Sequence, residues 1–262
     1  MQKLKIIDYD FIFVSGTIGA GKSSLIDKLD SLYQNQCYIV KEYIDYDEFG
    51  DMKLNELIKG CQNAFDFQKY VVDCYIKQFV AADKFFENKS GQKIIICERH
   101  PIETLLFGSF KLNQKEMEYL HDYIKTMCEK LRIPLPKDCK MIEISNNQYE
   151  SNCSLDNIAD RVMVQKGKTK NLFCHLTVDD KVQISRLIKR DRPSDRSYLI
   201  EPNMEYLRRV NIHYQNMLIW EYDIKISTLY LFYLYDVDEG YDCIEEEPKK
   251  VKAKPFKLPS KP

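Results

Sequence analysis

The sequence predicts an α/β fold built around a parallel sheet of about five strands, because short apolar runs alternate with longer segments of helical periodicity. The runs are rich in β-branched and aromatic residues, as buried strands of parallel sheets are. Four of them stand out, at 11–14, 37–40, 93–97 and 229–232. Helical spacing covers about 21–34, 62–88, 113–131 and 203–221. This βαβα alternation is typical of open α/β sheets flanked by helices.

Two further segments compete for one more strand. Residues 140–145 and 172–177 both have the composition of a strand, and the sequence leaves the choice open. The polar stretch between them predicts an inserted loop over about 146–171. The end of the chain, 245–262, is charged and rich in proline, which predicts a disordered tail. Residues 1–244 then form one predicted domain.

Composition excludes several classes of protein. The chain has 262 residues, with 39 Lys+Arg against 40 Asp+Glu and a formal net charge of -1. Such a chain is not a globally basic nucleic-acid binder, so we expect no nucleic-acid partner. No apolar run approaches the roughly 18 residues of a membrane-spanning helix, and the amino terminus lacks the pattern of a secretory signal. We therefore expect an intracellular, cytoplasmic protein without a membrane partner, whose nine cysteines are reduced.

A glycine-rich motif follows the first predicted strand. Residues 16–23, GTIGAGKS, match the pattern G-x-x-x-x-G-K-[ST], and a helical segment follows at once. In such a loop the backbone N–H groups converge on phosphate oxygens, Lys22 reaches the terminal phosphates, and the Ser23 hydroxyl can ligate Mg²⁺. The motif predicts a nucleotide-binding site. By itself it fits a GTPase, a motor protein or a small-molecule kinase.

Two glutamates stand at the carboxyl ends of predicted strands, where open α/β sheets bind their ligands. Glu42 follows the strand at 37–40, and Glu98 follows the strand at 93–97. Glu98 is a candidate Mg²⁺ ligand, and the adjacent Arg99 can steady an anion. Glu42 is a candidate general base for an attacking hydroxyl. The alternative for each glutamate is a solvated charge at a strand end.

A basic segment, RLIKRDRPSDR, occupies residues 186–196 and holds five basic groups. Beside a phosphate loop, such a segment predicts a lid whose arginines stabilise the negative charge of phosphoryl transfer. A solvated helix end or an RNA-binding patch is the alternative.

Together these motifs resemble those of the deoxynucleoside kinases, most closely the herpesvirus-type thymidine kinases. The resemblance covers roughly 10–110 and 172–241. It rests on the loop GTIGAGKSSL, on Glu42 in the place of the family's catalytic glutamate, on ERHPI at 98–102 and on the lid arginines in register. It implies a P-loop kinase fold with an Arg-rich lid, ATP and Mg²⁺ as cofactors, and a homodimer, and it hints at a large DNA virus as the source.

The resemblance implies ATP-dependent phosphorylation of a small-molecule deoxynucleoside, with thymidine the first candidate. The 5'-hydroxyl would be phosphorylated, giving the monophosphate and ADP in nucleotide salvage for DNA synthesis. The alternative is a deoxynucleoside monophosphate (thymidylate) kinase. A more distant alternative is a nucleotide-dependent nucleic-acid-binding protein.

The resemblance also assigns roles to individual residues. The implied catalytic residues are Lys22, Glu42, Arg99, Arg190, Arg192 and Arg196. The donor nucleotide would contact Gly16, Gly19, Ala20, Gly21, Lys22, Ser23, Ser24, Arg186, Glu239 and Gly240, the last two in a loop similar to the family's adenine loop. Mg²⁺ would be held by Ser23 and Glu98. The deoxynucleoside would contact Glu42, Gln68, Val71, Tyr75, Arg99, Thr104, Phe107 and Asp195.

The implied base pocket favours thymidine. Gln68 stands where the family has a glutamine that pairs with the base. Its amide offers a donor and an acceptor that suit N3–H and C4=O of thymine and, when flipped, suit other bases. Val71 and Tyr75 follow at i+3 and i+7, on the same face of a helix. Tyr75 stands where deoxycytidine kinases have an arginine, and Thr104 stands where purine- and cytidine-preferring relatives have an aspartate.

Three positions depart from the family pattern. The lid acid is Asp195 instead of glutamate, and the tyrosine expected at the sugar hydroxyl falls near Lys59. The aromatic residue expected beneath the base falls at Gly108, where Phe107 or Phe110 is the candidate replacement.

Overall fold

The computed structural model describes residues 9–146, 152–200 and 203–217. Its centre is a five-stranded, all-parallel sheet in the order β2-β3-β1-β5-β4. The strands are β1 (Asp10–Gly16), β2 (Cys37–Val40), β3 (Ile94–Glu98), β4 (Lys140–Ser145) and β5 (Asn171–Thr177). The predicted fold class is confirmed. The predictions at 229–232, in the loop at 236–241 and in the tail lie outside the described residues.

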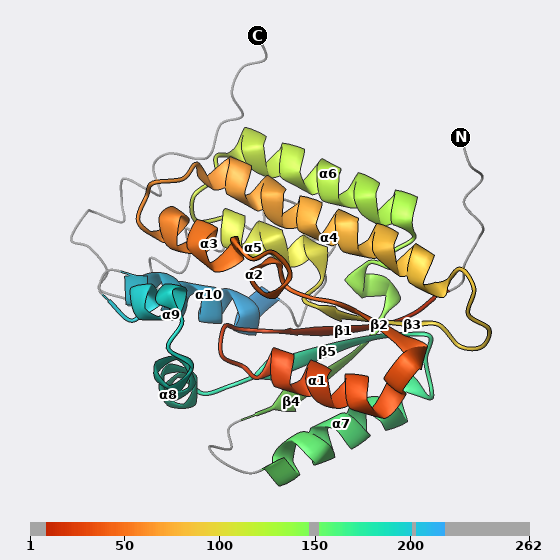
Figure 1. The fold of residues 1–262 in the computed structure, drawn as a ribbon. Helices are drawn as coiled ribbons and strands as arrows, with labels where there is room; N and C mark the ends of the chain where they lie inside the picture. Colours follow the sequence, from red (N-terminus) through yellow and green to blue (C-terminus); the bar gives the residue numbers. More distant parts are fainter. Residues whose placement is uncertain (1–8, 147–151, 201–202, 218–262) are drawn as a thin grey trace.

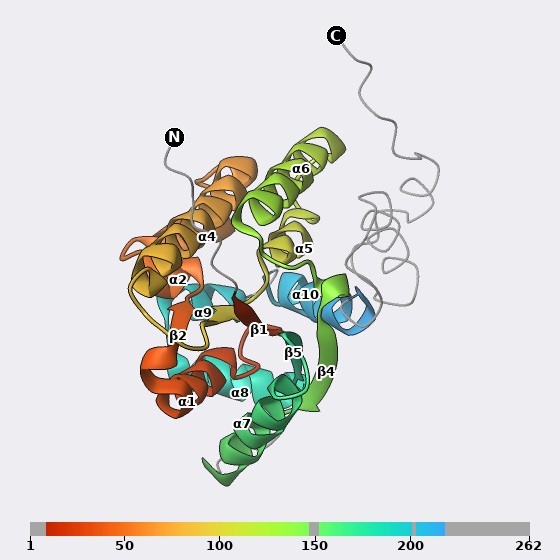
Figure 2. The same ribbon diagram turned by 90° about the vertical axis from the view of Figure 1, so that its right-hand side faces the viewer.

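Side chains of the strands alternate between two buried faces of the sheet. In β1, Phe11 and Phe13 enter one apolar core, whereas Ile12 and Val14 enter the other. Helices α4 (Ala64–Phe86), α5 (Thr104–Gly108) and α6 (Gln114–Leu131) cover the first face, and α1 (Lys22–Tyr33) and α7 (Asn152–Lys166) cover the second (Figures 1 and 2). Because both faces of the sheet are buried, the sequences of the strands are nearly continuous runs of apolar residues.

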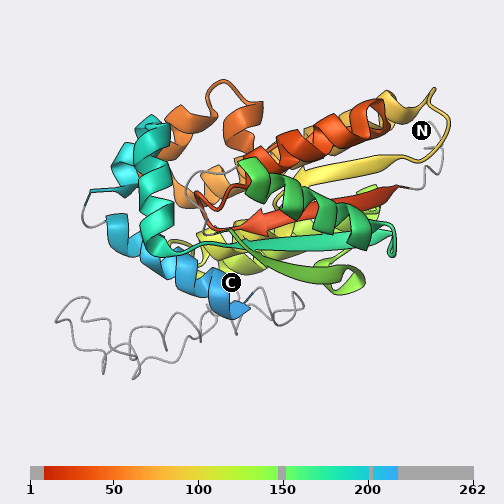
Figure 3. The same cartoon turned by 90° about the horizontal axis from the view of Figure 1, so that it is seen from below.

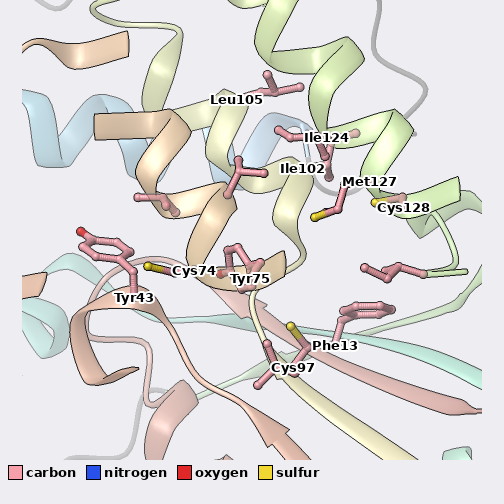
Figure 4. Close-up of a cluster of buried hydrophobic side chains, with 14 of the residues drawn as sticks. Phe13, Tyr43, Cys74, Tyr75, Cys97, Ile102, Leu105, Ile124, Met127 and Cys128 are labelled. Carbon is pink, nitrogen blue, oxygen red and sulfur yellow. The ribbon is translucent and has the colours of Figure 1, made fainter. Parts of the chain in front are cut away.

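The larger core lies between the sheet and the helices α4 to α6. Figure 4 shows how Phe13 of β1 and Cys97 of β3 gather with Tyr75 of α4 and with Met127 and Cys128 of α6. The N-termini of the two long helices, α4 and α6, are capped by asparagine side chains. Asn63 Oδ1, for example, accepts a hydrogen bond of 3.0 Å from a backbone N–H in the first turn of α4. This packing fixes α4 against the strand ends that the site uses.

The carboxyl ends of the strands meet at one edge of the sheet. Val14 lies opposite both Glu98 and Cys174, and Val40 lies opposite Cys97. Around this edge gather the remaining α-helices of the described chain, namely α2 (Tyr43–Tyr46), α3 (Gly50–Ile58), α8 (Asp180–Arg190), α9 (Pro193–Tyr198) and α10 (Asn203–Met217) (Figures 1 and 3). Short 3-10 turns occupy Gln34–Gln36 (η1), Pro101–Glu103 (η2) and Pro136–Asp138 (η3).

The segment between the two competing strands differs from its prediction. Both candidates are strands, and they pair in parallel as β4 and β5. The prediction of an inserted loop over 146–171 is wrong, because the connection between β4 and β5 contains the helix α7. The segment is polar, and three of its apolar side chains (Ile158, Ala159 and Val162) gain their burial where α7 packs against α1 and β5.

Within the described part of the chain, no helix combines the length and the hydropathy that crossing a bilayer requires.

Candidate active site

A cavity of about 610 Å³ opens at the carboxyl ends of the strands, a size typical of small-molecule sites. Most of the residues singled out from the sequence line it. They are Gly19, Gly21, Lys22, Ser23, Ser24, Glu42, Gln68, Val71, Tyr75, Glu98, Arg99, Thr104, Phe107, Arg186, Arg190, Arg192 and Asp195. Gly16, Ala20 and Arg196 do not line it, and Glu239 and Gly240 lie outside the described residues.

The phosphate loop connects β1 to α1 in a conformation that only glycine adopts without strain. Gly16, Gly19 and Gly21 have φ of +137°, +77° and +96°. A Cβ atom on Gly16 would lie 2.3 Å from the backbone oxygen of Leu176 in β5. The close approach of the two strand ends therefore requires glycine at the start of the loop.

Lys22 is a buried cation at the first position of α1. Its Nζ donates to the backbone oxygen of Thr17 at 3.1 Å, inside the loop that it follows. Burial, and then the nearby charge of Arg99, lower the pKa of Lys22 to about 8. An anion bound in the loop would stabilise the charged form of this lysine.

Ser23 and Glu98 lie side by side beneath the loop. The Ser23 hydroxyl donates to Glu98 Oε1 at 2.9 Å. Burial, and then the charge of Glu42, raise the pKa of Glu98. A cation bound at this carboxylate would therefore stabilise its ionised form. In the described residues there is no group of three or more His, Cys, Asp or Glu side chains that would hold a metal ion alone. The Ser23 hydroxyl and the Glu98 carboxylate are oxygen donors of the kind that would suit Mg²⁺ together with further oxygen ligands.

Glu42 and Arg99 form an ion pair across the cavity wall. Arg99 Nε donates to Glu42 Oε1 at 2.9 Å, and the side chains are 4% and 19% exposed. Burial acts to raise the pKa of Glu42, but the charges of Arg99 and Lys22 outweigh it and leave that pKa below its usual value. Glu42 is therefore an ionised carboxylate that faces the cavity.

Gln78 holds the backbone immediately before Glu42, and sequence reasoning missed it. Its side-chain amide donates to the oxygen of Lys41 at 2.9 Å and accepts from the nitrogen of Lys41 at 2.8 Å. A detectable signal existed, because Gln78 follows Gln68, Val71 and Tyr75 along the buried stripe of α4. A buried amide on such a stripe indicates a specific hydrogen-bond partner.

One face of α4 supplies the predicted base pocket. Gln68, Val71 and Tyr75 line the cavity from this face. The Tyr75 hydroxyl donates to the backbone oxygen of Glu98 at 3.0 Å, which ties α4 to the end of β3. Gln68 is buried, and among the described residues its amide has no hydrogen-bond partner. This amide is available to a ligand.

Of the two phenylalanines considered as the aromatic residue beneath the base, Phe107 lines the cavity. Phe110 instead packs edge-on against Tyr206 and His213. Lys59, which falls near the position expected for a tyrosine at the sugar hydroxyl, is exposed at the end of α3 and does not line the cavity. Tyrosines line the cavity at other places, namely Tyr43, Tyr198 and Tyr206.

The first part of the predicted lid lies over the phosphate loop. Arg186, on α8, donates to the backbone oxygens of Gly19 and Ala20 at 3.1 and 3.2 Å. Its other nitrogen donates to the backbone oxygen of Asn146 at 2.9 Å, and Asn146 Nδ2 donates to Ala20 at 2.7 Å. Asn146, a buried residue directly after β4, therefore clamps Arg186 to the loop. No sequence motif marked it.

The other lid arginines take three different positions. Arg190 Nε donates to Asp195 Oδ2 at 2.7 Å, and Arg192 donates to Asp45 Oδ1 at 2.8 Å, both at the cavity. Arg196 pairs with Asp191 at 2.6 Å, and both side chains are more than half exposed. The structure thus brings Arg190 and Arg192, but not Arg196, to the cavity.

Comparison with known proteins finds little similarity in sequence. No protein-family model matches the chain, and no curated protein matches it. Among solved structures it is similar to a deoxyadenosine kinase from M. mycoides with bound dATP. The identity is 17%, the aligned region covers 87% of this chain and 100% of that chain, and the TM-score is 0.45. At this identity and TM-score, the likeness assigns neither family nor reaction to the chain.

Proposed function

We propose that the protein transfers the γ-phosphoryl group of ATP to the 5'-hydroxyl of a deoxynucleoside, with thymidine as the first candidate. One observation supports this above all others: a carboxylate–arginine pair, Glu42–Arg99, lines the same cavity as the phosphate-loop residues Lys22 and Ser23. A nucleotide-binding loop needs no such pair beside it, whereas transfer to a hydroxyl needs a group that accepts the proton.

In this proposal the donor phosphates bind the phosphate loop. Lys22 and the backbone N–H groups of 19–23 would hold the β- and γ-phosphates. Ser23 and Glu98 would hold Mg²⁺, which when bound would neutralise charge on the donor phosphates. Arg190 and Arg192 would stabilise the negative charge on the equatorial oxygens of the γ-phosphoryl group during its transfer. Arg196 would join them only if the lid moved, because its side chain faces solvent.

Glu42 would accept the proton of the 5'-hydroxyl while that oxygen attacks the γ-phosphorus and ADP departs. A carboxylate with a lowered pKa is a weak base, but phosphoryl transfer has a loose transition state in which the attacking oxygen carries little bonding to phosphorus. What Glu42 must do is orient the hydroxyl and take its proton late. Arg99 would keep the carboxylate ionised and directed at the cavity.

The acceptor pocket would bind the base between α4 and α5. The buried amide of Gln68 would pair with the Watson–Crick edge of the base, and Phe107 would pack against its ring. Asp195 would receive the sugar hydroxyl, with Arg190 holding its carboxylate in place. Tyr75 and Thr104, which line the cavity in place of the Arg–Asp pair expected in cytidine-preferring relatives, are the reason to place thymidine first.

A monophosphate acceptor is the alternative, and the contacts favour it less. Such an acceptor needs a further cation to bind its phosphate. Arg99 is already engaged by Glu42, and Arg186 by the phosphate loop. We therefore place nucleoside phosphorylation first.

The deciding test is ADP release with Mg-ATP and each deoxynucleoside in turn, with thymidine monophosphate beside them. Release that peaks with thymidine supports the reaction and the base pocket. A peak with deoxyadenosine, deoxyguanosine or deoxycytidine would keep the reaction and overturn the pocket assignment. Release only with the monophosphate would favour the alternative, and no release with any acceptor would overturn the proposed function.

A further inference from the structure

Arg99 is held on the side opposite Glu42 by two residues that carry no assigned role, Glu103 and Tyr214. We propose that these two are positioning residues, which fix the plane of the Arg99 guanidinium so that its Nε faces Glu42. The proposal rests on the proposed function, because it deepens the account of how the catalytic carboxylate is oriented.

Glu103 is a fully buried carboxylate one turn after Arg99. Its Oε2 accepts from Arg99 NH1 at 3.3 Å, and its Oε1 accepts from the backbone N–H of His100 at 2.8 Å. Glu42 alone would balance the charge of Arg99. Removing a second carboxylate from water costs free energy. Burial accordingly raises the pKa of Glu103. Charge balance alone therefore does not explain its presence.

Tyr214 brings α10 into the same contact. Its hydroxyl donates to Glu103 Oε2 at 2.6 Å and accepts a hydrogen bond from Arg99 NH1. The ring is completely buried, edge-on to Phe107 and stacked parallel to His175 at 6.0 Å between centroids. The hydroxyl thus closes a three-membered network of Arg99, Glu103 and Tyr214.

The network leaves the guanidinium one orientation. Arg99 NH1 donates to the backbone oxygen of Gly16 at 2.6 Å as well as to Glu103 and Tyr214, so this end of the group is fixed against the phosphate loop. Nε is then left for Glu42 alone. Arg99 itself has a left-handed backbone, with φ of +64°, which turns its side chain back under the loop. Loss of the contacts at NH1 would let the planar group rotate away from Glu42.

The arrangement also connects the lid to the catalytic pair. Tyr214 belongs to α10, the helix that follows the lid helices α8 and α9 and packs against α9. One hydroxyl on that helix contacts the arginine that orients Glu42. Removal of this hydroxyl should therefore lower turnover and leave substrate binding intact.

The test uses Tyr214→Phe and Glu103→Gln in the full chain, with Tyr123→Phe as the matched control. Tyr123 donates to Asp73 at 2.6 Å on the α4–α6 side of the molecule, away from the cavity. We expect kcat with the preferred acceptor to fall about tenfold to a hundredfold in both variants, while both KM values stay within about threefold. Tyr123→Phe should match the wild-type protein. An unchanged kcat, or a rise in KM without a fall in kcat, would overturn the proposal.

A second readout does not depend on phosphotransfer. In protein labelled with ¹⁵N-arginine, the Nε–H signal of Arg99, assigned by its loss in Arg99→Lys, should exchange slowly with water because it donates to Glu42. Exchange should be at least about tenfold faster in Tyr214→Phe and unchanged in Tyr123→Phe. Equal exchange in both would overturn the positioning role. An inactive wild-type protein would refute the proposed function alone, and Tyr214→Phe keeps the test available if Glu103→Gln does not fold.

Discussion

Replacing Glu42 with glutamine isolates the charge of the proposed base from its shape. The amide has the size of the carboxylate and can still accept a hydrogen bond from Arg99 Nε through its oxygen. It cannot accept the proton of a hydroxyl. The cavity wall should therefore keep its form while the chemical step loses its proton acceptor.

The size of the effect follows from the place of Glu42 in the site. General-base assistance is worth about 10²- to 10⁴-fold in rate, which corresponds to about 2.7–5.4 kcal/mol of activation free energy. Arg99 keeps its contacts with Gly16, Glu103 and Tyr214 in the variant. The folded state therefore keeps the hydrogen bond from Arg99 Nε and loses only the charge of Glu42, a loss of at most about 1–3 kcal/mol. At roughly 2–4 °C of Tm for each kcal/mol, the variant stays folded at assay temperature if the wild-type Tm is in the usual range.

The assay measures single-turnover ADP formation and, separately, nucleoside binding by calorimetry. We expect Glu42→Gln to bind the nucleoside within about threefold of wild type and to lose at least about a hundredfold in turnover. The control is Glu129→Gln, which removes an exposed carboxylate from α6, outside the cavity. Turnover near the wild-type value in Glu42→Gln would remove Glu42 from the role of base.

Three more changes test other parts of the site and the fold. Arg190→Ala should lower kcat by about 10³-fold or more if this arginine stabilises the transition state. The control Arg208→Ala removes one member of an exposed surface ion pair on α10 and should leave kcat unchanged. Equal kcat in the two variants would refute the lid role of Arg190. Gln68→Leu should raise KM for thymidine at least about tenfold, through the lost pairing with the base, with little change in kcat; an unchanged KM in steady-state assays would take the amide out of base recognition. Burial lowers the pKa of His100 to about 3. The unfolded chain therefore binds a proton below about pH 6.5 that the folded state excludes. Urea denaturation between pH 6.5 and 5 should show wild-type stability falling relative to His100→Asn by up to about 1.4 kcal/mol per pH unit, and parallel stability curves would contradict this.

The parts of the site that the sequence predicted are those governed by local geometry. The phosphate loop follows from eight consecutive residues, because its glycines and Lys22 act within one turn between strand and helix. Glu42 and Glu98 were predictable for a second reason: carboxyl ends of parallel strands meet at one edge, whatever the helices between them do. Gln68, Val71 and Tyr75 were found as a helical stripe, which the structure places on the cavity side of α4.

Other elements escaped because their partners lie far away in the chain. The residues of α7 carry too little apolar periodicity to predict a helix, and their burial depends on packing against α1 and β5. Arg196 sits in register with its fellow lid arginines, yet it faces solvent because Asp191 pairs with it outside the cavity. The role of Asn146 could not be predicted, because its contact with the phosphate loop depends on the position of β4 in the sheet.

The sequence by itself determined the class of fold, the nucleotide loop and the end of the sheet at which chemistry would occur, because each depends on short-range patterns or on the common direction of parallel strands. Only the tertiary structure decided how the buried charges are balanced. Arg99 meets Glu103 four residues on but Tyr214 115 residues away, and Gln78 meets Lys41 across 37 residues. Such contacts join side chains that share no local pattern, because packing of α4 and α10 on the sheet, not spacing along the chain, brings them within hydrogen-bond distance.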